Sequence, residues 1–492
     1  MRHPDPTPEQ EKIIDAFRSG DTCTIIAAAG SGKTTSLRMI AETAGPRRGL
    51  YLAYNKAIAT DAAASFPAGT LCKTAHALAY RTYGSQFRDR MNGPRVPATQ
   101  AARILGINEA LHIGEHHLQP KHIARLAQEA VQRYCHSAED EIQPYHVPTV
   151  AGLEDIGLRS EVRAFALPYA RKAWADLRQV SGQLRFTHDI YLKIWGLSRP
   201  QLPYDFILFD EAQDANPVVL SVVRDQKDTQ LVAVGDPNQA IYGWRGAVDS
   251  MDQFGGDRLY LSKSFRFGPQ IAAEANKWLA ILDAELRVTG FERIASTVGP
   301  LAAPDAVLCR TNAQAIGEVM TGIDAGRKVA LVGGGDEMLR LAQAAVGLKA
   351  GIGTDHPELF AFANWGEVQD YAEFDSAGAD LKVFVKLVDK HGADVIIDTL
   401  QQLTRDESRA DVIISTAHKA KGREWESVRV APDFREPKPN EDGTPGEVTR
   451  EDAMLAYVTV TRAKLQLDRC GVAWVDAYVP GAGRVASPDE DA

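Results

Sequence analysis

The segment AAAGSGKT (27–34) has the residue types and spacing of a loop that binds nucleotide phosphates. It lies between an apolar run that predicts a strand and a longer run that predicts a helix. Small residues let backbone N–H groups surround the phosphates, Lys33 bridges the β- and γ-phosphates, and Thr34 holds Mg²⁺. The pattern usually begins with glycine, and Ala27 stands there instead. The residues expected to contact ATP here are Ala28, Ala29, Gly30, Ser31, Gly32, Lys33, Thr34 and Thr35.

A second chemical pattern, ILFDEAQD (207–214), ends an apolar strand with an acidic pair. Asp210 could hold Mg²⁺ through its water shell, and Glu211 could polarise the attacking water. An acidic pair at the end of a strand can also cap a helix. Together with the Lys33 loop, however, the pair predicts ATP hydrolysis, with phosphoryl transfer to another substrate as the alternative.

Two arginines further along the chain could supply positive charge to the transferring phosphoryl group. They are Arg266 in LSKSFRF and Arg462 in AYVTVTRA, both in the second α/β region. An arginine that arrives only in the assembled site raises the rate by about 10³–10⁵-fold. Each arginine taken alone could equally lie on the surface. If two domains face each other across ATP, hydrolysis is coupled to domain closure, as a motor requires.

The elements that must position these residues alternate between strands and helices. Strand-like runs such as TIIA (24–27), LYLA (50–53), FILF and TQLVAVG each precede a loop, and most lead into a helical pattern, which predicts an α/β fold with parallel sheets. Two stretches carry helical periodicity instead, so we expect two α/β domains, each with a helical insertion. The expected boundaries are 1–76 and 196–255 for the first domain, 77–195 for its insertion, 256–350 and 409–475 for the second domain, 351–408 for its insertion, and 476–492 for an acidic tail.

Composition sets limits on the class of protein. A chain of 492 residues is too long for one hydrophobic core. The net charge of −10 argues against a uniformly basic nucleic-acid binder, but it allows a basic groove on an acidic body. Five cysteines without a C-x-x-C pair argue against a zinc ribbon, an iron–sulfur cluster or a disulfide framework. The histidine-rich segment LHIGEHHLQPKH is interpreted as a solvated helix–loop segment rather than a metal site.

Targeting signals are not visible in the sequence. No apolar run approaches the roughly 20 residues of a membrane span, and the N-terminus lacks the apolar core of a signal peptide. We therefore expect a cytoplasmic protein, nucleoid-associated in a prokaryote, without a membrane partner. Few residues follow the last expected strand, so we expect no appended nuclease domain.

An ordered set of motifs resembles the superfamily 1 helicases of the UvrD/Rep type. The motifs are TPEQ, AAAGSGKT, AYNKAIA, CKTAHALAY, DEAQD, VGDPNQAIYGWRGA, SFR, STAHKAKGREWE and LAYVTVTRA. The segments AYNKAIATDAAASFP and FTHDIYLKIW, and the small second insertion, look most like the F-box DNA helicases and their compact bacterial and phage relatives. The resemblance covers about residues 7–470, and no F-box is visible in the sequence.

The resemblance implies two RecA-like domains of the P-loop NTPase class, with ATP and Mg²⁺ at their interface. Gln10 would read the edge of adenine, Phe265 would stack on the base, and Glu424 would lie near the ribose. Gln239 would sense the γ-phosphate, and Arg266 and Arg462 would be the finger arginines. Arg423 and Trp425 depart from the common Leu and Phe of relatives, which affects local packing more than mechanism. The residues implied to contact DNA are Tyr54, Asn55, Lys56, Thr74, His76, His418 and Lys419.

The segment VGDPNQAIYGWRGA (234–247) joins two of these roles. Its Gln239 half would face the γ-phosphate, and Tyr242 and Trp244 could stack on unstacked bases, a contact worth about 1–3 kcal/mol per base. Trp244 could instead fill a pocket between domains. His76 and His418 could likewise be core or capping histidines.

The function implied by the resemblance is ATP-dependent 3′→5′ translocation on single-stranded DNA with duplex unwinding. The expected partners are single-stranded DNA and single-strand/duplex junctions, with recombination, repair or phage-defence proteins also possible. One alternative is a DNA-stimulated ATPase that strips proteins from single strands with little unwinding. Another is a non-motor P-loop switch or kinase, against which the TAHKAKG and TVTRA motifs argue.

Overall fold

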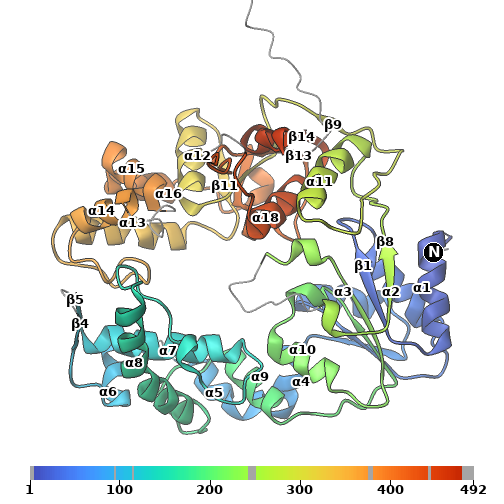
Figure 1. Ribbon diagram of the computed structural model, residues 1–492, viewed down its shortest axis with the longest axis horizontal. Helices are drawn as coiled ribbons and strands as arrows, with labels where there is room; N and C mark the ends of the chain where they lie inside the picture. Colours follow the sequence, from blue (N-terminus) through green and yellow to red (C-terminus); the bar gives the residue numbers. More distant parts are fainter. Residues whose placement is uncertain are drawn as a thin grey trace, which may run out of the picture.

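The computed structural model describes residues 5–93, 96–113, 116–241, 251–374, 381–440 and 445–478. Two six-stranded parallel sheets carry the fold, and helices cover them (Figure 1). The predicted α/β class with parallel sheets is therefore confirmed. Tyr242 and Trp244, predicted to stack on bases, lie outside the described residues.

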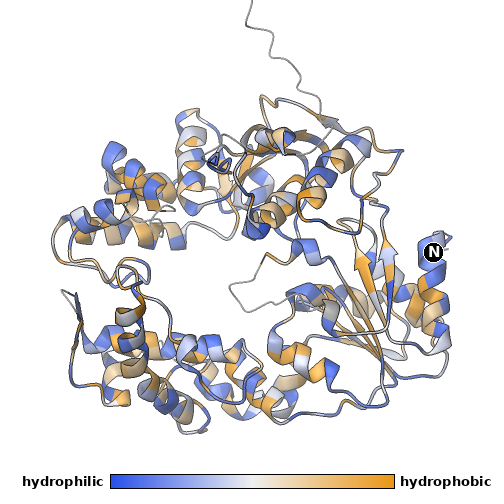
Figure 2. Cartoon of the chain, viewed as in Figure 1, coloured by the Kyte–Doolittle hydropathy of each residue, from blue (hydrophilic) through white to orange (hydrophobic). Residues whose placement is uncertain are grey.

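The first sheet carries the Lys33 loop. Its strands β1, β2, β6 and β7 are buried along their whole length, as expected for parallel strands covered on both faces. Figure 2 shows these strands as apolar. The strand order is β3 (Thr70–Lys73), β2 (Gly49–Leu52), β6 (Phe206–Phe209), β7 (Gln230–Gly235), β1 (Cys23–Ala27) and β8 (Asp257–Leu261). The helices of this sheet are α1 (Pro8–Ser19), α2 (Lys33–Glu42), α3 (Lys56–Ser65) and α10 (Pro217–Arg224).

The strand β8 corrects the expected boundary at residue 256. It pairs with β1 along its whole length, from Cys23 opposite Asp257 to Ala27 opposite Leu261. This strand therefore belongs to the first sheet, and its prediction as part of the second α/β region is wrong. The apolar pattern of a strand does not specify its partner, because pairing depends on contacts distant in sequence.

The second sheet has the same parallel architecture. Every pair of adjacent strands in it runs parallel. The strand order is β11 (Val329–Leu331), β12 (Val412–Thr416), β10 (Ala306–Cys309), β13 (Trp425–Val430), β14 (Ala463–Asp468) and β9 (Thr297–Val298). The helices of this sheet are α11 (Pro269–Ile281), α12 (Asn312–Asp324), α17 (Ala417–Ala420) and α18 (Arg450–Val460). We call the first sheet with its helices the first lobe, and the second sheet with its helices the second lobe.

A helical insertion separates β3 from β6 in the first lobe. It also contains a short antiparallel hairpin of β4 (Leu111–Ile113) and β5 (His116–Leu118), on which His112 stacks against His117 with ring centroids 4.3 Å apart. The histidine-rich segment is therefore a hairpin followed by a helix start, not the expected helix–loop. The helices of this insertion are α4 (Ala75–Thr82), α5 (Arg88–Met91), α6 (Ala98–Leu105), α7 (Pro120–Cys135), α8 (Ile156–Leu177) and α9 (His188–Leu197).

The second lobe has a smaller helical region between β11 and β12. Its helices are α13 (Asp336–Lys349), α14 (Trp365–Phe374), α15 (Lys382–His391) and α16 (Ala393–Gln401). The segment before α14 meets α7 of the helical insertion, where Lys121 pairs with Asp355 at 2.9 Å. Figure 1 shows the two lobes also meeting at the α18 side of the molecule. The lobes thus touch at two separate places.

Within the described ranges, no helix combines the length and the apolar character needed to cross a bilayer.

Candidate nucleotide and nucleic-acid site

The phosphate-binding loop lies between the end of β1 and the start of α2, as predicted. Gly30 and Gly32 have φ of +73° and +79°, which favour glycine. A Cβ atom at Gly30 would also lie 2.6 Å from the Cβ atom of Arg266. Ala27 is not among the described non-glycine residues with positive φ. Its methyl group is therefore tolerated where the pattern usually has glycine.

The loop also contains a buried polar atom that fits a phosphate oxygen. Ser31 is 3% exposed, and its hydroxyl has no hydrogen-bond partner among the described residues. A buried hydroxyl without a partner costs about 1–3 kcal/mol. The loop precedes the N-terminus of α2, whose free N–H groups attract anions. These features suit the triphosphate of ATP.

The predicted magnesium ligands lie next to each other. The Asp210 carboxylate follows β6, and its Oδ2 atom accepts hydrogen bonds from Thr34 Oγ1 at 3.3 Å and from Tyr51 Oη at 2.5 Å. Burial raises the pKa of Asp210 to about 6, and the neighbouring Glu211 carboxylate adds to the rise. Hydroxyl and carboxylate oxygens are the ligands that Mg²⁺ prefers, so this pair fits the ion.

The predicted base, Glu211, is held in an unusual conformation. Its φ of +51° is rare for a residue with a side chain, and such strain is typical of functional sites. Its Oε1 atom lies 3.2 Å from Lys33 Nζ, and Gln213 Nε2 donates to its Oε2 atom at 2.7 Å. Burial would raise the pKa of Glu211, but the Lys33 and Lys421 ammonium groups lower it to about 2. Glu211 is therefore a carboxylate at neutral pH.

Both predicted arginines line the same pocket, but only Arg462 comes from the second lobe; the expected place of Arg266 in the second α/β region is wrong, because it follows a strand of the first sheet. Arg462 follows α18, is 2% exposed, and places Nη2 3.4 Å from Gln239 Oε1. Arg266 follows β8 of the first lobe, but it reaches the second lobe through Glu424 at 2.7 Å and the Thr461 carbonyl at 3.2 Å. Burial and the neighbouring Arg266 lower the pKa of Arg462 to about 9, which leaves it charged at neutral pH. Lys33, Glu211, Gln239, Arg266 and Arg462 line one pocket.

Lys421 is a further residue of this pocket that the sequence analysis did not single out. Its Nζ atom lies 2.5 Å from Asp214 Oδ2 and also contacts the Gln239 carbonyl oxygen. Burial lowers the pKa of Lys421, whereas Asp214 and Glu211 act against that shift. Its place in STAHKAKGREWE, a motif already recognised, was the available signal.

The two residues predicted to contact adenine, Gln10 and Phe265, differ in their surroundings. The Gln10 side chain accepts from Thr7 N at 2.9 Å and donates to Ser36 Oγ at 3.0 Å, so its amide is already hydrogen-bonded. The Phe265 ring is 41% exposed, and its backbone N–H donates to the Gly30 carbonyl at 2.8 Å. The Phe265 ring lies beside the loop and packs edge-on against Phe291, with ring centroids 5.6 Å apart. Both adenine roles stay predictions.

The DNA-contact residues predicted on the first lobe lie beyond the carboxyl ends of β2 and β3, where open parallel sheets bind ligands. Tyr54 is 43% exposed, and Lys56 is exposed at the start of α3. Asn55 and Thr74 cap α3 and α4 through their side-chain oxygens. His76 lies 3.4 Å from Asp189, so it has an acidic partner from α9 rather than a place in the core.

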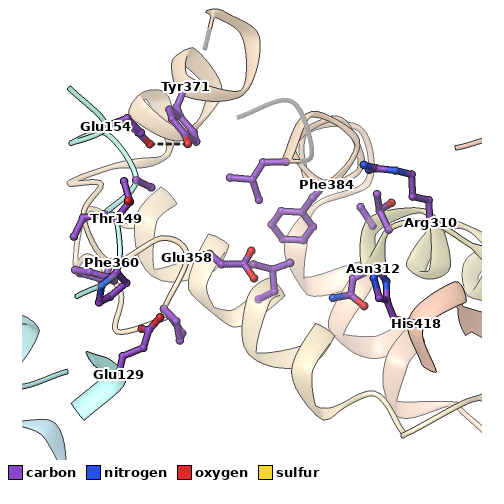
Figure 3. Close-up of a pocket in the computed structure, with 18 of the residues that line it drawn as sticks. Glu129, Thr149, Glu154, Arg310, Asn312, Glu358, Phe360, Tyr371, Phe384 and His418 are labelled. Atoms are coloured by element: carbon purple, nitrogen blue, oxygen red, sulfur yellow. Dashed lines mark hydrogen bonds between the residues drawn. The ribbon is translucent and has the colours of Figure 1, made fainter. Parts of the chain in front are cut away.

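On the second lobe, His418 and Lys419 lie in different surroundings. His418 lines a cavity of about 750 Å³ between the helical insertion and the second lobe, together with Arg310 and Asn312 (Figure 3). Lys419 instead pairs with Glu337 at 3.0 Å. Arg310 and Asn312 were not singled out from the sequence, although they follow β10 at the end where ligands bind.

Comparison with known families agrees with this arrangement. The model of the UvrD/REP helicase N-terminal domain matches residues 183–254, and that of the UvrD-like helicase C-terminal domain matches residues 372–468. Their segments include the acidic pair and Gln239 in the first lobe, and Lys421 and Arg462 in the second.

Individual relatives are similar over most of this chain. It is 28% identical over 502 residues to F-box DNA helicase 1 of Gallus gallus, covering 93% of this chain and 48% of the relative. It is 28% identical over 512 residues to F-box DNA helicase protein 1 of Schizosaccharomyces pombe, covering 94% and 57%. DNA helicase II of Escherichia coli is 26% identical over 296 residues, covering 54% and 39%.

The chain spans about half the length of the curated relatives it matches. Both family models nevertheless fall on the lobes that form the pocket, in the order expected along the chain. The matched segments thus contain pocket residues from both lobes, whereas the phosphate loop and Arg266 lie outside the two matched ranges. The chain carries UvrD-like helicase N- and C-terminal domains and is similar to the UvrD/Rep-type helicases of superfamily 1.

Proposed function

We propose that this chain hydrolyses ATP with Mg²⁺ between its two lobes and couples hydrolysis to 3′→5′ movement on single-stranded DNA, with duplex unwinding. The observation that carries the proposal is the meeting of Arg462 from the second lobe with Gln239 from the first, in the pocket of Lys33 and Glu211. Because the catalytic residues come from both lobes, the rate of ATP hydrolysis depends on how the lobes close. A motor requires this coupling between hydrolysis and domain movement.

The residues of this pocket divide the work of hydrolysis. Lys33 and the loop N–H groups bind and orient the triphosphate, and Glu211 accepts a proton from the attacking water. Thr34 and Asp210 would hold Mg²⁺, which supplies charge neutralisation on the phosphates. Arg462 and Arg266 stabilise charge that develops on the transferred group. Gln239 contacts Arg462 and so links the γ-phosphate side to the opposite lobe.

Glu211→Gln is expected to bind ATP and fail to hydrolyse it. The amide keeps the shape of the side chain and cannot accept the proton from water, so turnover should fall by about 10²–10⁴-fold. The Lys33 contact weakens because the charge is lost. Phosphate release and binding of a fluorescent ATP analogue measure the two effects separately. Turnover equal to the wild type would mean that Glu211 is not the base.

The cavity between the helical insertion and the second lobe suits a single strand. Its second-lobe wall contains Arg310, Asn312 and His418 beside three carboxylates, Glu358, Glu451 and Asp452, and the wall formed by the insertion contains Glu129 and Glu154 (Figure 3). We propose that the DNA backbone passes Asn312 and His418, whose N–H groups can donate hydrogen bonds to phosphates.

The decisive experiment compares ATP turnover with and without single-stranded DNA and adds unwinding of tailed duplexes. We expect DNA to stimulate turnover, and duplexes with a 3′ tail to be unwound in preference to those with a 5′ tail. Salt should weaken DNA binding steeply, because phosphate contacts release counterions. DNA-stimulated turnover without unwinding would indicate a translocase that clears proteins from single strands. ATP turnover that is the same with and without single-stranded DNA would contradict the proposed motor function.

A further inference from the structure

Tyr457 places one hydroxyl between the two lobes. The residue lies on α18 and is completely buried. Its hydroxyl accepts a hydrogen bond from Ala29 N at 3.3 Å and donates one to Asp236 Oδ2 at 3.0 Å. Burial raises the pKa of Tyr457 well above its ordinary value, so the hydroxyl keeps its proton. A single side chain of the second lobe thus holds both the phosphate loop and the end of β7.

The partner carboxylate organises the γ-phosphate side of the pocket. Asp236 is fully buried, and its Oδ2 atom also accepts from Gln239 Nε2 at 2.7 Å. Gln239 Oε1 in turn lies 3.4 Å from Arg462 Nη2. The carboxylate that Tyr457 contacts therefore orients the side chain that meets Arg462.

The same segment also reaches the predicted base. Asp236 N donates to Gln213 Oε1 at 3.1 Å, and Gln213 Nε2 donates to Glu211 Oε2 at 2.7 Å. A Cβ atom at Gly235 would lie 2.2 Å from Gln213 Oε1, so only glycine permits this close approach. The connection from Tyr457 to Glu211 consists of three consecutive hydrogen bonds.

The last turns of α18 connect these groups to the arginines. The Tyr457 carbonyl accepts from Thr461 Oγ1 at 2.9 Å, and the Thr461 carbonyl accepts from Arg266 Nη1 at 3.2 Å. Arg462 follows immediately. Any shift of α18 relative to the first lobe therefore changes the Tyr457 contacts together with both arginines.

We propose that Tyr457 is a positioning residue that transmits lobe closure to Gln239 and Glu211 through Asp236. The inference rests on the proposed function, because it concerns the same ATP site. A tyrosine that only fills the core would need its ring and not its hydroxyl. The hydroxyl here has both a donor and an acceptor on the opposite lobe, so its loss should affect turnover more than folding.

The test is Tyr457→Phe with Tyr134→Phe as its matched control. Tyr134 is also completely buried, and its hydroxyl donates to the Asp140 carbonyl at 2.7 Å in the helical insertion. Removing a hydrogen bond to a charged group should lower DNA-stimulated kcat by about 10- to 100-fold, with KM for ATP within about 3-fold. Tyr134→Phe should keep the kcat of the wild type. The two variants should have similar melting temperatures.

A double-mutant cycle with Gln239→Ala separates positioning from a general loss of stability. If Tyr457 acts through Gln239, Tyr457→Phe should add little to the loss already caused by Gln239→Ala. Multiplied losses would overturn the proposed route. If Tyr457→Phe does not fold, Asp236→Asn weakens the same contact from the first lobe and should lower kcat with little change in KM.

Two results separate this inference from the proposed function. Wild-type protein without ATP turnover would contradict the proposed function itself. Normal wild-type turnover, with Tyr457→Phe equal to Tyr134→Phe, would overturn only the role of Tyr457. A rise in KM with unchanged kcat would also overturn it, because Tyr457 would then serve binding alone.

Discussion

Lys33→Ala is expected to lower ATP turnover by about 10²–10³-fold or more, with and without DNA. Lys33 Nζ lies 3.2 Å from Glu211 Oε1. Burial would lower the pKa of Lys33, but the Glu211, Asp236 and Asp210 carboxylates raise it above its ordinary value. The alanine variant leaves three neighbouring carboxylates, two of them buried, without this cation, and they repel the triphosphate.

The measurement is steady-state phosphate release, with thermal melting to verify that the variant is folded. Lys390→Ala is a suitable control, because Lys390 is exposed in the last turn of α15, in the second lobe's insertion. This control should match the wild type in turnover and melting temperature. A folded Lys33→Ala variant with near-normal turnover would contradict the assignment of ATP hydrolysis to this site.

Arg462→Ala should lower kcat by about 10³-fold or more while ATP affinity changes much less. A finger arginine acts on charge that develops during the reaction, so its loss is felt mainly in the transition state. Arg462 also donates to the Val458 carbonyl at 2.8 Å and the Arg423 carbonyl at 3.3 Å. Alanine leaves a buried cavity there, so some loss of stability is expected as well.

Arg462→Lys separates the two effects, because it keeps a positive charge and most of the volume. Lysine lacks the planar fork that reaches several acceptors at once, so kcat should still fall while the melting temperature changes less. Equilibrium binding of an ATP analogue completes the comparison. A loss confined to ATP affinity, with kcat intact, would make Arg462 a ground-state binding residue.

The sequence alone was sufficient to predict the phosphate-binding loop and the acidic pair, because each depends on the conformation of a few consecutive residues. The phosphate loop requires small residues, two glycines with positive φ and a lysine at the start of a helix, all within eight consecutive residues. The acidic pair after β6 follows from a buried strand that ends in a loop. Alternating strands and helices likewise predicted two parallel sheets, because each pattern extends over neighbouring residues.

Only the tertiary structure decided which of these elements meet. The strand β8 joined the first sheet, although its sequence resembles any other half-buried strand. Tyr457 was not singled out from the sequence, and its hydroxyl contacts Ala29 and Asp236, each more than two hundred residues away in the chain. Sheet partners and contacts between lobes depend on complementary surfaces distant in the chain, which a local pattern does not contain.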